Sequence, residues 1–145
     1  MNLKLKLVRE TAKVPAYGTD GAAAMDLSAC LDGPLILNHG DLAMIPTGIA
    51  IALPSRDYVA LVFARSGLGV KHGISLSNGV GVIDSDYRGE ISVGLTNLSH
   101  NPYTIHNGDR IAQLAVVPLA HPTVTVVSEL DDTARSDGGF GSTGT

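Results

Sequence analysis

Two carboxylates stand beside a tyrosine and an arginine in residues 81–90, GVIDSDYRGE. Asp84 and Asp86 lie two positions apart, and Asp84 directly follows the apolar run 80–83. An aspartate is ionised at neutral pH and can accept a proton from water as a general base. The same residue types also form ordinary solvent-exposed hairpin turns. The segment alone therefore leaves both a catalytic carboxylate and a simple turn open.

A second segment, ARSGLG at residues 64–69, has the residue types that bind phosphate. An arginine fork matches phosphate oxygens, a serine hydroxyl donates, and glycines let backbone amides approach closely. The segment is not a Walker loop, because the GxxxxGKS or GxxxxGKT spacing is absent. By itself it is equally typical of a short Gly-rich connection with one exposed arginine.

Asp26 and Gln113 are further candidates, in AAAMDLSA (22–29) and GDRIAQL (108–114). A carboxylate among small apolar residues is costly to bury unless a cation or an arginine pairs with it. Gln113 could equally be an exposed strand residue. The five histidines are scattered without metal-ligand spacing, so any metal is expected to be a hard cation such as Mg²⁺ carried by phosphates. Ser66 lacks a histidine and acid partner, which argues against a covalent serine hydrolase.

The composition restricts the class of protein that can hold these residues. The chain has 145 residues, enough for one domain, and its net charge of -4 gives no basic surface for direct binding to nucleic acid. No apolar run is long enough to span a bilayer. The N-terminus MNLKLKLVRE lacks a signal-peptide pattern, so we expect a soluble, cytoplasmic protein. A single cysteine excludes an intrachain disulfide.

The elements that must position these candidates are expected to be short strands. Glycine (17) and proline (7) are frequent and tryptophan is absent, so the core must consist of Val, Ile, Leu and Ala. The strand candidates are residues 3–8, 35–37, 43–45, 49–53, 58–63, 74–76, 80–83, 90–98, 103–105, 110–118 and 123–127. KVPAYGTDG reads as a loop. Residues 109–117 could be drawn as a helix, but Val116-Val117-Pro118 favours a strand. Regular spacing predicts an all-β sandwich or barrel with at most one helical turn, within 66–71.

The last residues, SDGGFGSTGT, differ from the rest of the chain. Their composition is typical of a disordered tail. They also hold one phenylalanine among glycines and hydroxyls, with Arg135 in front, which suits an arm that orders over a ligand. We therefore expect a catalytic domain at residues 1–134 and a flexible arm at 135–145.

Together, five segments resemble the ordered motifs of the trimeric dUTP pyrophosphatases (dUTPases). They are AAAMDLSA, ARSGLG, NGVGVIDSDYRGE, GDRIAQL and R-SDGGFGSTG, spread from residue 22 to residue 144. Three positions depart from the family's pattern: Ala24 and Met25 replace Gly and Leu, and Ser136 replaces Gly. The resemblance implies a distorted β-barrel or jelly roll and a homotrimer. It also implies active sites at the subunit interfaces, closed by the C-terminal arm.

The resemblance further implies hydrolysis of dUTP to dUMP and pyrophosphate, which keeps uracil out of DNA and supplies dUMP for thymidylate synthesis. Asp84 is similar to the family's general base, which activates water for attack on the α-phosphorus. Gln113 is similar to a residue that contacts phosphate or positions water. Tyr87 corresponds to the residue under the deoxyribose that excludes a 2′-hydroxyl. Residues 78–83, with Asn78, Val82 and Ile83, are similar to the family's hairpin that reads uracil. Ser92 corresponds to a position that contacts the nucleotide in the family.

The remaining family roles concern the triphosphate. The resemblance assigns the phosphates to Arg65, Ser66 and Gly67. In the arm it assigns a phosphate clamp, a lid on uracil and two hydroxyl donors to Arg135, Phe140, Ser142 and Thr143. Asp26 would hold Mg²⁺ through water.

Two alternatives remain open at this stage. The related dCTP deaminase branch shares the fold but attacks the base ring with a glutamate in a different hairpin context, and the intact spacing from Asp84 to Tyr87 counts against it. A non-enzymatic β-sandwich that kept the fold is the second alternative. The presence of Asp84, Arg65 and the arm counts against that alternative.

Overall fold

A computed structural model gives the fold of the chain and describes residues 2–139. It consists of short antiparallel strands and one short helix, α1 (Ser66–His72). The strands are β1 (Lys4–Leu7), β2 (Ala16–Tyr17), β3 (Met25–Ser28), β4 (Leu35–Leu37), β5 (Leu42–Pro46), β6 (Ile49–Ala52), β7 (Tyr58–Phe63), β8 (Ile74–Leu76), β9 (Gly81–Ile83), β10 (Ser92–Asn97), β11 (Tyr103–Ile105) and β12 (Arg110–Pro118).

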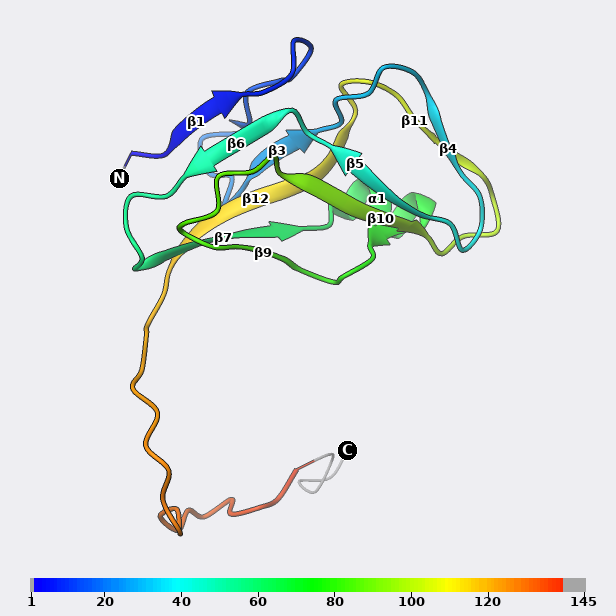
Figure 1. The fold of residues 1–145 in the computed structure, drawn as a ribbon. Helices are drawn as coiled ribbons and strands as arrows, with labels where there is room; N and C mark the ends of the chain where they lie inside the picture. The colour runs from blue at the N-terminus through cyan, green and yellow to red at the C-terminus, as the bar shows by residue number, and fades with distance from the viewer. Residues whose placement is uncertain (1, 140–145) are drawn as a thin grey trace.

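The largest sheet has the strand order β2-β3-β12-β7-β9, and a second sheet has the order β5-β10-β8. Two further pairs, β1-β6 and β11-β4, complete the body (Figure 1). Neighbours in the sheets are distant in sequence, as in a jelly roll. The expected all-β, jelly-roll-like fold with one short helix is therefore confirmed.

Several expected strands have the observed bounds. These are β4, β7, β8, β11 and β12. The strand interpretation of 110–118 is confirmed and the alternative helix is wrong, because β12 pairs with both β3 and β7. The helical segment is longer than the single turn expected. It ends at Gly73, whose left-handed conformation (φ 68°) lets its N–H bond to the last-turn carbonyls of Leu68 and Gly69.

Two expectations about strands were wrong. Residues 123–127 form no strand, because within residues 2–139 no other strand pairs with them, and Val124 and Val126 are 86% and 93% exposed. After β12 the described chain instead leaves the sheets and extends away from them (Figure 1). The segment read as a loop, residues 13–21, contains β2, whose two residues pair with β3. The strand β3 was itself missing from the expected set.

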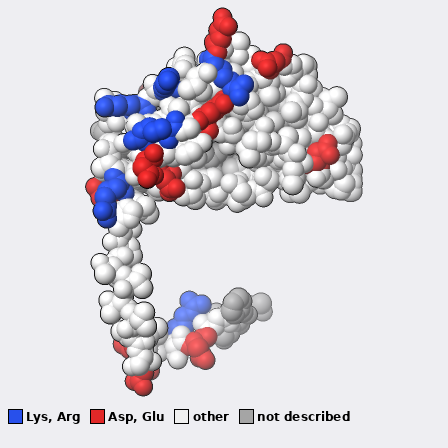
Figure 2. Space-filling model, in the orientation of Figure 1, with Lys and Arg blue, Asp and Glu red and all other residues white. Residues whose placement is uncertain are grey.

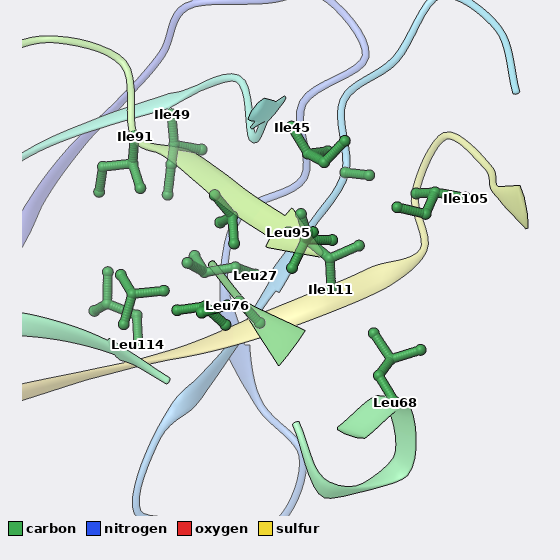
Figure 3. Close-up of a cluster of buried hydrophobic side chains, with 14 of the residues drawn as sticks. Leu27, Ile45, Ile49, Leu68, Leu76, Ile91, Leu95, Ile105, Ile111 and Leu114 are labelled. Carbon is green, nitrogen blue, oxygen red and sulfur yellow. The ribbon is translucent and has the colours of Figure 1, made fainter. Parts of the chain in front are cut away.

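The core lies between the two sheets and is made of aliphatic side chains, as the composition predicts. Leu27 from β3 and Leu114 from β12 of one sheet, and Leu95 from β10 of the other, are each 1% exposed and belong to the same buried cluster (Figure 3). Burial of a leucine or isoleucine side chain contributes about 1.5–3 kcal/mol. The central strand β12, which pairs with β3 on one edge and β7 on the other, is therefore a rigid support for its polar residues Arg110 and Gln113.

A β-bulge in β12 decides where its polar residues point. The register against β3 shifts between Arg110 and Ala112, so that Ile111 and Ala112 are both buried. In an uninterrupted strand, residues three positions apart point to opposite faces. The extra residue brings Arg110 and Gln113 to the same side, where both meet Asp26 of β3.

Charged side chains on the face seen in Figure 2 gather around β1, and acidic and basic groups are mixed there. The view contains no broad patch of a single sign. The one helix within residues 2–139 has seven residues. It is not long and apolar enough to cross a membrane.

Candidate active site

The turn after β9 opens onto a hollow of about 340 Å³. Asp84 is exposed at its edge, and its backbone carbonyl accepts a hydrogen bond from Tyr87 N at 3.2 Å, which closes the turn. The Asp84 carboxylate makes no hydrogen bond within residues 2–139, so its oxygens remain available to a ligand or water. The lining residues are Met44, Val82, Ile83, Asp84, Tyr87, Glu90, Ile91 and Ser92.

A smaller hollow of about 120 Å³ adjoins the first and shares Val82, Ile83 and Ser92 with it. It adds Asn78, which precedes β9, and Gly81, the first residue of β9. Val80 N donates to Asn78 O at 2.9 Å, and the positive φ of Gly79 (74°) allows this tight reversal. The residues predicted to read uracil, the predicted general base Asp84 and the predicted sugar contact Tyr87 thus lie along two adjoining hollows.

Arg88 stabilises the turn that carries Asp84. Its Nη1 donates to the carbonyls of Ser85 and Tyr87, both at 2.8 Å. The Tyr87 hydroxyl donates to the carbonyl of Glu90 at 3.0 Å. These contacts fix the backbone between Asp84 and Glu90 without using the Asp84 carboxylate.

A second group of predicted residues surrounds Asp26. The Arg65 Nε donates to Oδ1 of Asp26 at 2.8 Å, and the Arg110 Nη1 donates to Oδ2 at 3.1 Å. The side chains of Arg65 and Asp26 are only 24% and 20% exposed, so the pair is partly shielded from solvent. The Asp26 carboxylate is therefore paired with two arginines, as expected for a charged group among small apolar residues.

Gln113 lies opposite Asp26 in the β3–β12 register, and its Nε2 donates to the carbonyl of Ala64 at 2.9 Å. That bond ties β12 to the residue before Arg65. Ser66 and Gly67 follow in the first turn of α1 and are exposed. Leu68 is 8% exposed and anchors this turn to the core. Arg65, Ser66, Gly67, Gln113 and Asp26 are thus brought together.

No hydrogen bond or ion pair of residues 2–139 joins these two groups, which lie on opposite edges of β7. The strand pairs with β9 on one side and with β12 on the other. Arg135 belongs to neither group: its Nε donates to the carbonyl of Gly138 within the tail, at 2.9 Å. The predicted contacts Phe140, Ser142 and Thr143 lie outside the described residues.

The carboxyl and imidazole groups form no direct metal cage within residues 2–139, where no three such groups converge. Asp26 is the carboxylate nearest the predicted phosphate ligands, and two of its lone-pair sites accept from Arg65 and Arg110. A carboxylate has about four such sites, so two remain for water. This donor set fits a hydrated Mg²⁺ that phosphates bring with them and does not fit an ion held by protein ligands alone.

Several lining or pairing residues were missed by sequence reasoning, among them Arg110, Glu90 and Met44. Glu90 is in the motif NGVGVIDSDYRGE and Arg110 is in GDRIAQL. Their charge, within motifs that already held candidate residues, was the signal that could have identified them. Met44 comes from β5, far from any motif, and reaches the hollow because β5 pairs with β10. The pKa of Glu90 is lowered, chiefly by the hydrogen bond from Arg9 and also by the Gly48 N–H, while burial opposes the shift.

A sequence profile of the dUTPase family matches residues 10–144. The chain belongs to the dUTPase family. A deoxyuridine 5'-triphosphate nucleotidohydrolase of Desulfotalea psychrophila is 53% identical over 135 residues, which cover 93% of this chain and 89% of that dUTPase. One of Desulfitobacterium hafniense is 49% identical over 146 residues, covering 99% and 97% of the two chains.

Solved dUTPase structures have the same fold. The dUTPase of Staphylococcus bacteriophage 80alpha with dUpNHpp superposes with a TM-score of 0.89 at 26% identity, covering 99% of each chain. A mutant dUTPase from phage phi11 of S. aureus, described as showing the coordination of a structural Mg(II) ion, gives 0.82 at 24% identity. That alignment covers 91% of this chain and 100% of the phage chain. The recognition made from five motifs is therefore confirmed.

Proposed function

We propose that the protein is a dUTP diphosphatase, which hydrolyses dUTP to dUMP and pyrophosphate. The observation that carries this function is the hollow that gathers Asp84, Tyr87, Val82, Ile83 and Ser92. Family membership and relatives named as deoxyuridine triphosphate nucleotidohydrolases support it. They also argue against the deaminase and non-enzymatic alternatives.

Asp84 serves as the general base in this proposal. Its exposed carboxylate takes a proton from a water molecule, whose oxygen forms a bond to the α-phosphorus of dUTP. The bond between the α-phosphorus and the bridging oxygen breaks, and pyrophosphate leaves with that oxygen. Phosphoanhydride hydrolysis needs positioning and charge neutralisation more than covalent help, so one base is sufficient.

The base and sugar bind along the two adjoining hollows. Asn78 to Ile83 present backbone donors and acceptors to uracil, and the wrong base leaves a buried polar group unpaired. Tyr87 packs against the deoxyribose and leaves no room for a 2′-hydroxyl. Ser92 contributes a hydroxyl at the point where both hollows meet.

The triphosphate binds the group around Asp26. Arg65 donates with its guanidinium, Ser66 and Gly67 contribute a hydroxyl and a backbone amide, and Gln113 contacts phosphate or the attacking water. When bound, Mg²⁺ neutralises charge that develops on the phosphates. Asp26, with two lone-pair sites not used by Arg65 and Arg110, would hold the hydrated ion through water.

The complete site requires more than one copy of the chain in this proposal. Within residues 2–139, no hydrogen bond or ion pair joins the residues around Asp84 to the residues around Asp26, which supports a homotrimer with active sites at subunit interfaces. Residues 1–134 form the catalytic domain, and residues 135–145 form an arm that closes over the site. Arg135 clamps phosphate, Phe140 stacks on uracil, and Ser142 and Thr143 donate to the terminal phosphates.

A pyrophosphate-release assay with Mg²⁺ and four nucleotides tests this function. We expect rapid release from dUTP and near-inert behaviour of dTTP, dCTP and UTP. Comparable turnover of UTP would rule out the proposed sugar selectivity. Absence of release from dUTP would rule out the activity.

A further inference from the structure

Tyr87 is 45% exposed, so the core does not hold its ring. Two contacts with the following backbone hold it instead. Its hydroxyl donates to the carbonyl of Glu90 at 3.0 Å. A Cβ at Gly89 would lie 2.6 Å from Cζ of Tyr87 and closer still to the hydroxyl oxygen, so the ring rests directly on the Gly89 backbone. The place of the Tyr87 ring is therefore set by the backbone of residues 89–90.

That backbone is fixed through the side chain of Glu90. The guanidinium of Arg9 donates to it twice, from Nε at 2.6 Å and from Nη2 at 3.0 Å. The N–H of Gly48 donates to Oε1 at 2.9 Å. A bidentate, charge-assisted pair of this kind is stronger and more directional than a neutral hydrogen bond. The side chains of Arg9 and Glu90 are 43% and 24% exposed, so the carboxylate end is the better shielded one.

The groups that hold Glu90 are themselves fixed. Val8 N donates to Gly48 O and Ile91 N donates to Ile49 O, both at 2.8 Å. Gly48 has a φ of 71°, and a Cβ there would overlap the side chain of Ala12, so only glycine fits. Three segments far apart in sequence, after β1, between β5 and β6, and before β10, therefore meet at one junction beside the hollow.

We propose that Arg9 and Glu90 are positioning residues, which hold Tyr87 against the deoxyribose and thereby set the discrimination against a 2′-hydroxyl. The inference rests on the proposed function, because that function places the sugar on Tyr87. Arg9 lies outside the lining of the hollow and acts only through Glu90. A displacement of about 1 Å is enough to cost an enzyme about a hundredfold in rate, and here it would open room for the extra hydroxyl.

The test is the ratio of kcat/KM for dUTP to kcat/KM for UTP, measured on one preparation of each variant. The fraction of active enzyme cancels in this ratio, so a purely structural defect does not change it. Arg9→Met removes both donors to Glu90 and keeps an apolar stem. Gly89→Ala displaces the Tyr87 ring and leaves the ion pair intact; Gly89 does not have a positive φ, so alanine adds no backbone strain. Glu90→Gln keeps the shape of the side chain and loses its charge.

We expect the ratio to fall about tenfold or more in Arg9→Met and Gly89→Ala, and by less in Glu90→Gln. Asp41→Asn is the matched control. Asp41 also holds a turn through its carboxylate, which accepts from Asn38 N at 2.7 Å, but no hydrogen bond joins that turn to Tyr87. Its ratio should equal that of the wild type.

Each outcome decides a different point. A wild-type ratio in Gly89→Ala and Glu90→Gln overturns the positioning inference, even if Arg9→Met fails to fold. An equal loss in Asp41→Asn overturns it too, because general loosening would then explain the effect. A wild-type enzyme that uses UTP as well as dUTP rules out the sugar selectivity on which the inference rests. A wild-type enzyme that releases no pyrophosphate from dUTP rules out the proposed function instead.

Discussion

The Nε of Arg65 donates to Oδ1 of Asp26 across 2.8 Å, although the two residues stand 39 positions apart. Arg110 holds the other carboxylate oxygen at 3.1 Å, and Arg65 Nη1 donates to the carbonyl of Arg110 at 3.3 Å. The guanidinium of Arg65 is therefore oriented before any phosphate arrives. Its Nη2 makes no hydrogen bond within residues 2–139 and is available to a ligand.

Arg65→Lys tests whether this oriented fork binds phosphate. Lysine keeps the charge but cannot make the planar, two-point contact, so kcat/KM for dUTP should fall by about 10–100-fold. Inhibition by deoxyuridine, which carries no phosphate, should be unchanged. Steady-state kinetics with deoxyuridine as competitor measures both. An unaltered kcat/KM would exclude Arg65 from the phosphate site.

Asp26→Asn tests the link between this carboxylate and Mg²⁺. A neutral amide attracts a hydrated cation less, so the Mg²⁺ concentration for half-maximal turnover should rise several-fold. Because Asp26 pairs with two arginines and is partly shielded from solvent, the loss of its charge should also lower the free energy of unfolding by about 1 kcal/mol. Mg²⁺ titration and thermal melting are the measurements. If the Mg²⁺ requirement stays the same while the stability falls, Asp26 only orients Arg65.

The sequence predicted the fold class because alternating apolar residues and Gly- and Pro-rich turns report strands locally. Strand β7 was placed to the residue on that basis. The strand β2 was missed, because two residues inside a Pro- and Gly-containing segment carry no periodic signal. The opposite error at residues 123–127 arose because β-branched residues favour strands in general, whereas a strand also needs an edge to pair with.

For the site, the motifs named the residues but could not show which of them meet. Asp26 and Gln113 face each other only because of the β3–β12 register, and Met44 reaches the hollow only because β5 pairs with β10. The pair of Arg9 and Glu90 spans 81 positions, and Arg9 lies in no motif. Such contacts follow from topology, which local residue patterns do not encode.

Removal of residues 135–145 tests the proposed arm. The described strands all end by Pro118, so the truncated protein should keep its fold and thermal midpoint. Turnover of dUTP should be greatly reduced, because Arg135, Phe140, Ser142 and Thr143 are lost together. Circular dichroism and pyrophosphate release check the two halves of this prediction. Full activity of the truncated protein would contradict the role of the arm as a lid.

The ion pair of Arg9 and Glu90 should make stability depend on pH in acid. The pKa of Glu90 is lowered in the folded protein from an ordinary value of 4.5, mainly by the Arg9 hydrogen bond. Its contribution to stability is therefore complete above pH 4.5 and is lost as the pH falls through the lower folded value. Melting curves of the wild type and Glu90→Gln should differ at pH 7 and converge as the pH falls below the lowered pKa of Glu90. A difference that is constant with pH would show that Glu90 does not titrate as an ion-paired carboxylate.

The central claim is that Asp84 activates the attacking water, and Asp84→Asn tests it most directly. The amide keeps the size of the side chain and the backbone bond from Tyr87, so the nucleotide should still bind. It cannot accept the proton, so turnover should fall by about 100–10,000-fold. Calorimetric titration with a non-hydrolysable dUTP analogue and pyrophosphate release from dUTP should be measured on the same preparation. Near-wild-type binding with turnover lost is the predicted result, and near-wild-type turnover would remove Asp84 from the role of base.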